Sequence, residues 1–213
     1  MIIYQNGEVM DNVFKELRKV IHEFPKNKWK EIYEEIKNNY DYYEYSNGGA
    51  MSHFGIYQQE PFMAKVCANL KLGIKAKVTD ENNINFKSYF KYYFKDNKLI
   101  ASEKYLSGGL YFINFHFYGT NEKTIITIEP KRNEIRFVAK CFYDDSHRIV
   151  SYYQSFYDVG PLVDDYQILN YQYAGDKIII TQTKVWNATS ATPKIRNEKW
   201  ELENKKLTFI TKW

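Results

Sequence analysis

Hydrophobic and polar positions alternate with a helical period near the start of this chain and with a strand period after about residue 86. In residues 11–24 the apolar side chains recur three or four positions apart, which makes one stripe along a helix. Asp11 or Asn12 suits the start of this helix, and Pro25 its end. A second stripe follows in residues 29–40, with Asn27 as its cap. The short link between them predicts an N-terminal αα-hairpin with a shared buried face.

The segment from residue 41 to residue 85 has a weaker pattern. Gly48 and Gly49 mark a turn, so residues 42–45 and 54–57 are expected to pair as a hairpin. Residues 61–73 fit a helix, because Pro61 suits a first helical turn and Gly73 suits a C-cap. Residues 74–78 then alternate like a strand.

From Phe86 onward the pattern predicts ten strands joined by short polar links. Links of this length connect antiparallel neighbours, since a parallel crossover needs a dozen or more residues. The expected strands are 86–95, 98–106, 110–118, 124–129, 134–143, 148–157, 166–173, 177–186, 196–202 and 206–213. The chain is therefore expected to be one α+β domain over 1–213, with a helical element in 1–60 and mainly antiparallel sheet in 61–213. A curved sheet, a sandwich and a partly open barrel all fit this β-meander.

The stretch FKSYFKYYFKDNKL, residues 86–99, interleaves aromatic and basic residues. Such interleaving is typical of single-stranded nucleic-acid binders, but also of an amphipathic strand. Separating alternate positions predicts a core face with Phe90, Tyr92 and Phe94. The other face is expected to point to solvent and to offer a surface for a protein partner. It carries Lys87, Tyr89, Lys91, Tyr93 and Lys95.

Composition adds limits to this picture. The 213 residues carry a net charge of +4, which is too mild to demand a polyanionic partner, and 18% of them are aromatic, with 20 Tyr. Residues 1–60 hold seven Lys or Arg against ten Asp or Glu, so the helical element is acidic. Cys67 and Cys141 are too few for a disulfide framework. Neither a signal peptide nor an 18-residue apolar span is present, so a cytoplasmic protein is expected, with no membrane contact.

No strong catalytic, nucleotide or metal motif occurs in the sequence. The two Gly pairs, 48–49 and 108–109, fit turns better than phosphate loops, and the segment CFYDDSHR offers too few convergent ligands for a metal. Cys67 and Cys141 fit small core residues better than nucleophiles. We therefore expect no catalytic residue, no metal and no cofactor. The alternative is a small-molecule binder or enzyme with a pocket between sheet and helices, built from His116, Asp144, Asp145 and His147.

Two segments resemble bacterial immunity proteins. EFPKNKWKEIYEEIKNNYDYYEYS resembles the N-terminal segment of YezG-type immunity proteins through Pro25, Trp29, Ile32 and Tyr33, although one extra residue separates Pro25 from Trp29. FYDDSHRIVSYYQ is similar to the Tyr-Asp hairpin repeats of bacterial toxin polyproteins and of some neighbouring immunity proteins. The resemblance implies a small protein that neutralises a partner toxin without catalytic residues of its own.

The sequence therefore favours a non-enzymatic protein-binding module. Glu31, Glu34 and Glu35 in the second helix would suit a basic partner such as a nuclease. A nucleic-acid partner using Lys87, Lys91 and Lys95 is the less favoured alternative, because the chain lacks a strongly basic balance. Partner identity, oligomeric state and sheet closure stay open at this point.

Overall fold

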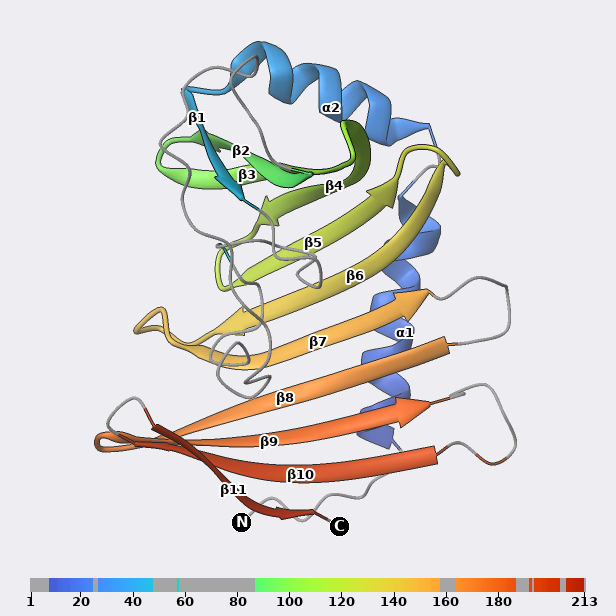
Figure 1. The fold of residues 1–213 in the computed structure, drawn as a ribbon. Coiled ribbons are helices and arrows are strands. Elements are labelled where there is room, and N and C mark those ends of the chain that lie inside the picture. The colour runs from blue at the N-terminus through green and yellow to red at the C-terminus, as the bar shows by residue number, and fades with distance from the viewer. Residues whose placement is uncertain are drawn as a thin grey trace. The chain divides into compact units, whose positions relative to one another are not determined.

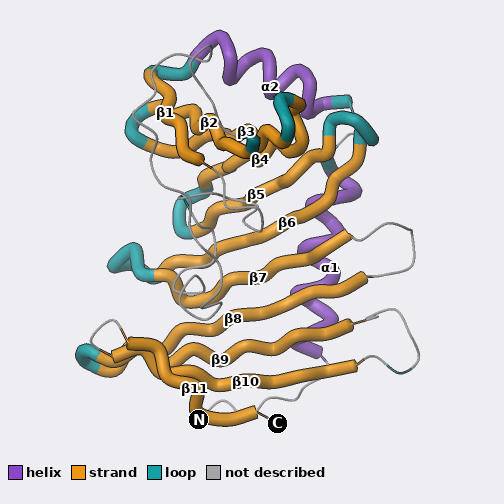
Figure 2. The backbone as a smooth tube through the Cα atoms, in the orientation of Figure 1, coloured by secondary structure: helices purple, strands orange, loops and turns teal. Residues whose placement is uncertain are grey.

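A computed structural model describes residues 8–24, 27–47, 57, 87–157, 164–186, 192, 194–203 and 206–212. These residues form two helices and eleven strands (Figures 1 and 2). The helices are α1 (Glu8–Glu23) and α2 (Lys28–Asn39). The strands are β1 (Tyr42–Asn47), β2 (Ser88–Lys95), β3 (Lys98–Leu106), β4 (Gly109–Tyr118), β5 (Glu122–Glu129), β6 (Glu134–Tyr143), β7 (Ile149–Tyr157), β8 (Asp164–Ala174), β9 (Lys177–Trp186), β10 (Lys194–Glu203) and β11 (Lys206–Lys212).

The strands form one open sheet in which each strand lies beside its neighbours in the chain, from β1 to β11 (Figure 1). The registers determined for the strand pairs are antiparallel. This confirms the α+β class and the antiparallel meander, and it selects a single sheet from the three arrangements left open by the sequence.

The structure describes only part of the N-terminal region for which the sequence predicted elements. The strand expected at residues 42–45 exists as β1 and pairs with β2, with Tyr43 opposite Tyr93, while its expected hairpin with residues 54–57 stays a prediction. Residues 54–56, 61–73 and 74–78 lie outside the described residues. Asn27 precedes α2 without a side-chain capping bond; its backbone carbonyl accepts the Lys30 N–H at 3.2 Å instead.

The chain divides into two compact units. Unit 1 comprises residues 1–25, 118–124 and 136–213, and unit 2 comprises residues 26–117 and 125–135. Helix α1 belongs to unit 1 and helix α2 to unit 2. The shared buried face of an αα-hairpin and the single domain therefore stay predictions, and each unit is described by itself.

Tight turns join the strands of unit 2. Asp96 and Asn97, between β2 and β3, have φ of 50° and 58°, and Ser107 and Gly108, between β3 and β4, have φ of 49° and 79°. Two successive residues with positive φ give the turn whose twist matches a two-residue hairpin. Gly108 is thus a turn residue, as expected from the sequence.

Both faces of β2 are buried in unit 2. Phe90, Tyr92 and Phe94 lie on the core face, as expected, and the ring of Tyr57 packs against Tyr92 at a centroid distance of 4.8 Å. The opposite face was expected to point to solvent, and for its centre this was wrong, since only 2% of Tyr93 is exposed. The physical reason is that α2 covers this face, through a hydrogen bond from Tyr33 of α2 to Glu103 of β3.

Unit 1 combines α1 with most of β6 and with the strands that follow it. Leu17 of α1 is fully buried, and α1 contacts β7. Glu16 of α1 accepts a hydrogen bond from the Lys140 ammonium of β6 at 3.1 Å. Helix α1 thus buries Leu17 within its own unit.

A ladder of buried glutamines crosses three adjacent strands of unit 1. The amide of Gln182 on β9 donates to Gln167 on β8 at 3.4 Å, and Gln167 donates to Gln154 on β7 at 3.2 Å. The Tyr152 hydroxyl also donates to Gln154, at 2.8 Å. These bonds can form only in the observed strand register, because a one-residue slip would move each amide to the opposite face of the sheet.

We expect Gln167→Leu to destabilise the protein by about 1–3 kcal/mol, because the buried Gln182 amide loses its acceptor and Gln154 loses one of its two donors. Gln172→Leu is the matched control, since Gln172 lies on the same strand and is exposed. Urea unfolding followed by circular dichroism measures both variants. Equal effects of the two substitutions would contradict a stabilising role for the ladder.

Candidate protein-binding site

Helix α2 carries an acidic row on its outer side, made of Glu31, Glu34 and Glu35. All three side chains are exposed, and none of them has an ion pair among the described residues. Their spacing of three and four residues places them on neighbouring turns of one helix. The row is therefore a group of three exposed carboxylates on one helix that form no ion pair among the described residues.

Lysines of the same helix could neutralise this row but make other contacts. Lys30 stands four residues before Glu34, a spacing that permits an ion pair. Its ammonium lies instead over the Trp29 ring, 5.6 Å from the centroid, and that of Lys37 lies 4.9 Å from the Tyr33 centroid. On α1, by contrast, Lys19 pairs with Glu23 at 3.8 Å.

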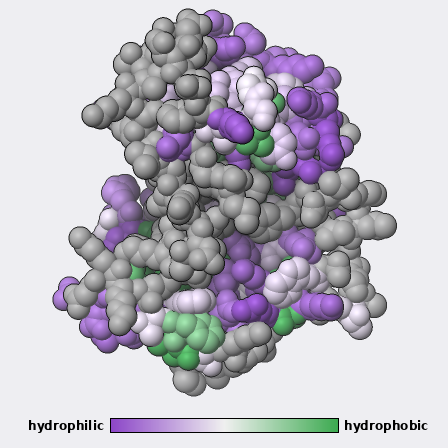
Figure 3. Space-filling view, in the orientation of Figure 1, coloured by the Kyte–Doolittle hydropathy of each residue, from purple (hydrophilic) through white to green (hydrophobic). Residues whose placement is uncertain are grey.

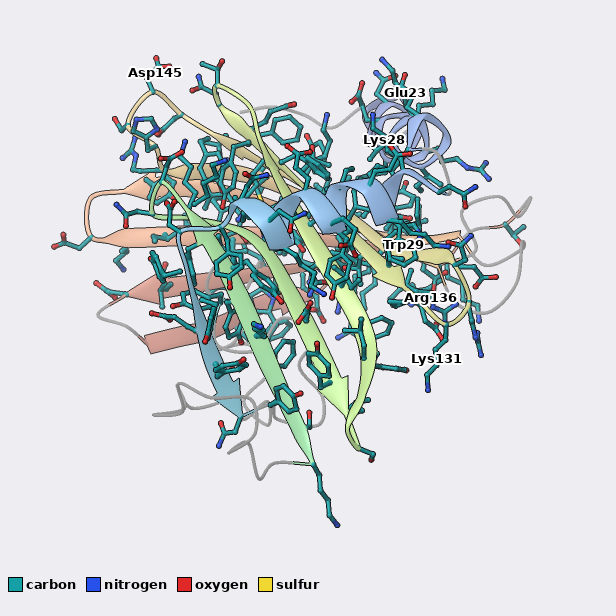
Figure 4. The ribbon with its side chains drawn as sticks, turned by 90° about the horizontal axis from the view of Figure 1, so that it is seen from above. Glu23, Lys28, Trp29, Lys131, Arg136 and Asp145 are labelled. Carbon is teal, nitrogen blue, oxygen red and sulfur yellow. The ribbon has the colours of Figure 1, made fainter. Side chains whose placement is uncertain are left out.

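The inner side of α2 is fixed to unit 2 by two polar anchors. The buried Trp29, labelled in Figure 4 at the start of α2, donates its indole N–H to the Asn133 side chain at 2.6 Å. Tyr33, one turn further along, donates to the Glu103 carboxylate. Because both anchors end in hydrogen bonds of fixed geometry, the acidic row is held in one orientation.

Glu103 is the centre of a tyrosine network, formed by Tyr33, Tyr93 and Tyr105 around its buried carboxylate. Tyr105 donates to it at 2.9 Å, and Tyr93 is also hydrogen-bonded to it. Burial, followed by the nearby Glu103 charge, raises the pKa of Tyr93 and of Tyr105 well above the usual tyrosine range. Several charge-assisted hydrogen bonds satisfy a carboxylate that would be costly to bury alone.

Lys91 lies among three tyrosine rings on the same face of unit 2. Its ammonium is 4.7 Å from the centroid of Tyr43, 5.1 Å from that of Tyr93 and 5.7 Å from that of Tyr45. In the strand register Lys91 stands directly opposite Glu103. Cation–π contacts thus hold the lysine expected to face a partner. Lys87 and Lys95, at the two ends of β2, are exposed as expected.

Two exposed tyrosines lie on the edge strand of unit 2, next in the chain to the end of α2. Tyr42 is 41% exposed and stacks on Phe94 at a centroid distance of 4.8 Å. Tyr43 is 37% exposed and packs edge-on against Tyr40. Tyrosines that are packed on one side and open on the other are typical anchors of protein interfaces.

The residues of the alternative pocket fall in different units. His116 is buried on β4 in unit 2, whereas Asp144, Asp145 and His147 belong to the turn between β6 and β7 in unit 1. Asp145 lies at the tip of that turn (Figure 4). The Asp144 carboxylate accepts the backbone N–H groups of Ser146 and Arg148 and the Arg148 side chain, and these bonds lower the pKa of Asp144. These bonds stabilise the turn between β6 and β7. The alternative pocket built from the four residues stays a prediction.

Metal and membrane signals are absent from the part of the chain that the structure describes. No group of three or more His, Cys, Asp or Glu residues there could hold a metal ion. Cys141 is a buried free thiol, which agrees with its expected place in the core, while Cys67 lies outside the described residues. Within the same ranges, neither helix has the length and apolar character that crossing a membrane requires.

Sequence reasoning missed Glu103, the residue on which the tyrosine network depends. Its signal is a lone acid inside a strand segment, ASEKYL, whose neighbours on the same face are Ala101 and Tyr105. The comparisons add no further assignment, since no family model, curated protein or solved structure matches this chain.

Proposed function

We propose that this protein is a non-enzymatic protein-binding module, and most concretely a bacterial immunity protein that neutralises a partner toxin. The observation that carries the proposal is the acidic row of α2, Glu31, Glu34 and Glu35, which is exposed and without ion pairs among the described residues. Such a row attracts a basic partner over a distance of about one Debye length, roughly 8–10 Å.

The anchors of α2 support the proposal, because a preorganised surface loses less entropy on binding than a mobile one. Trp29 and Tyr33 fix the helix, so the carboxylates need no ordering when a partner arrives. Tyr43 supplies exposed aromatic area on the face of the sheet that α2 covers, as interface anchors do. A nuclease or another toxin domain with a basic active-site cleft has the chemistry that complements this surface.

We expect charge reversal of the acidic row to slow association with the partner recovered from the native host. At low ionic strength the association rate constant of the triple variant Glu31→Lys, Glu34→Lys, Glu35→Lys should fall at least tenfold, because electrostatic steering turns into repulsion. The difference should shrink as salt is added. Stopped-flow or surface-based kinetics at two salt concentrations measures both effects.

The matched control reverses three exposed acids elsewhere, Glu23→Lys, Glu134→Lys and Asp176→Lys, and so changes the net charge equally. This variant should retain most of the association rate. If both triple variants slow association to the same extent, net charge alone is responsible and the assignment of the site to α2 is wrong.

A further inference from the structure

Three tyrosine rings of unit 2 surround one cation, the ammonium group of Lys91. The rings belong to Tyr43 and Tyr45 of β1 and to Tyr93 of β2. Their centroids lie 4.7, 5.7 and 5.1 Å from the Lys91 Nζ. Each distance is within the range of about 6 Å in which an aromatic ring attracts a cation. Together the three rings form a tyrosine cage around the ammonium.

Contacts between aromatic rings hold the tyrosine cage in place. Tyr43 and Tyr45 meet edge-on at a centroid distance of 5.4 Å. Tyr40, directly after α2, packs edge-on against Tyr43 at 5.8 Å and against Tyr93 at 5.2 Å. Because packed side chains support one another, we expect the cage to keep its shape when its occupant leaves.

The surroundings of the tyrosine cage favour a cation over an anion. Glu103 stands opposite Lys91 in the strand register, and Tyr93 is hydrogen-bonded to the Glu103 carboxylate. A phenol that donates to a carboxylate becomes more electron-rich, which strengthens its attraction for a cation. The acidic row of α2 lies in the same unit, and Figure 3 shows mostly hydrophilic surface along this helix.

The tyrosine cage is open on one side. Tyr45 and Tyr93 are each 2% exposed, whereas Tyr43 is 37% exposed and lies on the edge strand β1. Tyr43 thus marks the side from which a ligand can reach the cage. Two buried rings and one exposed ring suit the charged head of a ligand, with the rest of the ligand remaining outside.

Lys91 fills the tyrosine cage as a part of the chain itself. A tethered ammonium group competes with an external one at a high effective concentration. The apparent affinity for an external ligand is therefore reduced in proportion to the fraction of cages that Lys91 leaves empty.

We propose that the tyrosine cage is a binding site for organic ammonium groups, and that Lys91 is a built-in competitor which such a ligand displaces. The ligand is a free organic ammonium ion or the lysine side chain of another protein, since both carry the same kind of cationic head. The cage is built from β1 and β2, so the proposal does not rest on the acidic row of α2 or on the proposed immunity function.

Isothermal titration calorimetry with tetramethylammonium chloride tests this site, with sodium chloride as the reference salt. Lys91→Ala empties the cage, so its dissociation constant should be at least about tenfold lower than that of the wild type. Adding Tyr43→Leu to Lys91→Ala should raise the constant at least about fivefold, because one ring is lost. Lys95→Ala, at the exposed end of β2, is the matched control and should bind as the wild type does.

Nuclear magnetic resonance of the wild type gives a measurement that does not depend on the folding of a variant. The Lys91 methylene protons next to the ammonium should resonate upfield of those of Lys95, because they lie among tyrosine rings. High concentrations of tetramethylammonium should move the Lys91 signals toward the position of the Lys95 signals. A blocked Gly-Lys-Gly peptide distinguishes the two sources of ligand. Displacement by the peptide identifies a lysine side chain, and displacement by tetramethylammonium alone identifies a free ammonium ion.

Four results would overturn the proposal. In calorimetry they are absent binding to Lys91→Ala, equal affinities of the wild type and Lys91→Ala, and an affinity of Lys91→Ala that Tyr43→Leu leaves unchanged. In the resonance measurement, Lys91 signals that tetramethylammonium does not move would show that Lys91 is a permanent part of the cage.

Discussion

Replacing Glu103 by leucine is expected to destabilise unit 2 by roughly 2–5 kcal/mol. The carboxylate accepts hydrogen bonds from Tyr33, Tyr93 and Tyr105, and leucine offers none of them an acceptor. Tyr93 is almost completely buried, so its hydroxyl cannot turn to water. Lys91, opposite Glu103 in the register, would also lose the nearest opposite charge on the adjoining strand. Urea unfolding, monitored by tyrosine and tryptophan fluorescence, measures the loss.

Two further variants separate the causes of this loss. Glu103→Gln keeps an acceptor oxygen but loses the charge, so it should destabilise by about half as much as leucine. Glu35→Leu removes an exposed glutamate of α2 and should change stability by less than about 0.5 kcal/mol. A loss below about 1 kcal/mol for Glu103→Leu would contradict the role of Glu103 as the common acceptor.

The buried tyrosines are expected to reduce stability above about pH 10, the ordinary pKa of tyrosine, and the net fall should be steep above about pH 10.5. Burial holds the folded-state pKa of Tyr93 and Tyr105 above that value, and the pKa of Tyr143 is raised for the same reason. The folded state therefore keeps protons that the unfolded chain releases. The stabilisation is fully present below the unfolded pKa and is lost as the pH rises toward the folded one. Tyr93 alone contributes about 1.4 kcal/mol per pH unit in that window, and the half-buried Tyr105 contributes less.

Two lysines make stability rise with pH, opposite to the effect of the tyrosines. They therefore determine the pH range in which the tyrosine effect can be measured. Desolvation lowers the pKa of Lys104 and of Lys123, so the folded state loses these protons at a lower pH than the unfolded chain does. Their effect on stability rises with pH and ends near pH 10.5, the ordinary value for lysine. Above that pH, the free energy of unfolding should decline, because the unfolded chain releases tyrosine protons that the folded state retains.

Urea unfolding at several pH values between 9 and 11.5 would show this decline. Tyr93→Phe should reduce its slope, because the variant has no proton to retain at that position. Tyr42→Phe, at an exposed tyrosine, should leave the slope as in the wild type. A slope that Tyr93→Phe does not change would mean that Tyr93 ionises in the folded protein.

The strands from β2 to β11 could be predicted closely from the sequence. For β3, β6 and β9 the expected bounds are those of the structure. The reason is physical, because period-two alternation ends at turns rich in Gly, Asn and Asp, and both signals are local. The link KDN, for example, contains the two positive-φ residues of the β2–β3 turn.

The position of Glu103 opposite Lys91 could not be predicted in the same way, because a β-bulge changes the register between β2 and β3. Counting back from the β2–β3 turn without a bulge would place Lys91 opposite Ser102. The register shifts by one residue between Tyr93 and Phe94, so Lys91 stands opposite Glu103 instead. Comparable shifts occur in the β3–β4, β6–β7 and β10–β11 pairs. A bulge has no reliable sequence signal of its own, yet it decides which charges meet.

The burial of Tyr93 depended on contacts that are distant in sequence. Alternation along β2 correctly separated Tyr92 from Tyr93, but it could not say what covers each face. Coverage comes from α2, sixty residues earlier, through the Tyr33–Glu103 hydrogen bond, whose partners are 70 residues apart. The same network that buries Tyr93 also fixes the acidic row on the outside of α2. The surface that we propose for a partner is thus the helix rather than the centre of the strand.

The most direct test of the protein-binding proposal is purification of the tagged protein from its native host under gentle conditions. The wild type should recover a basic partner protein in stoichiometric amount. The triple variant Glu31→Gln, Glu34→Gln, Glu35→Gln should recover much less of it while unfolding at the same urea concentration as the wild type. Recovery of no stoichiometric partner by the wild type would contradict the binding module itself. Equal recovery by both proteins would contradict the acidic row of α2 as its site.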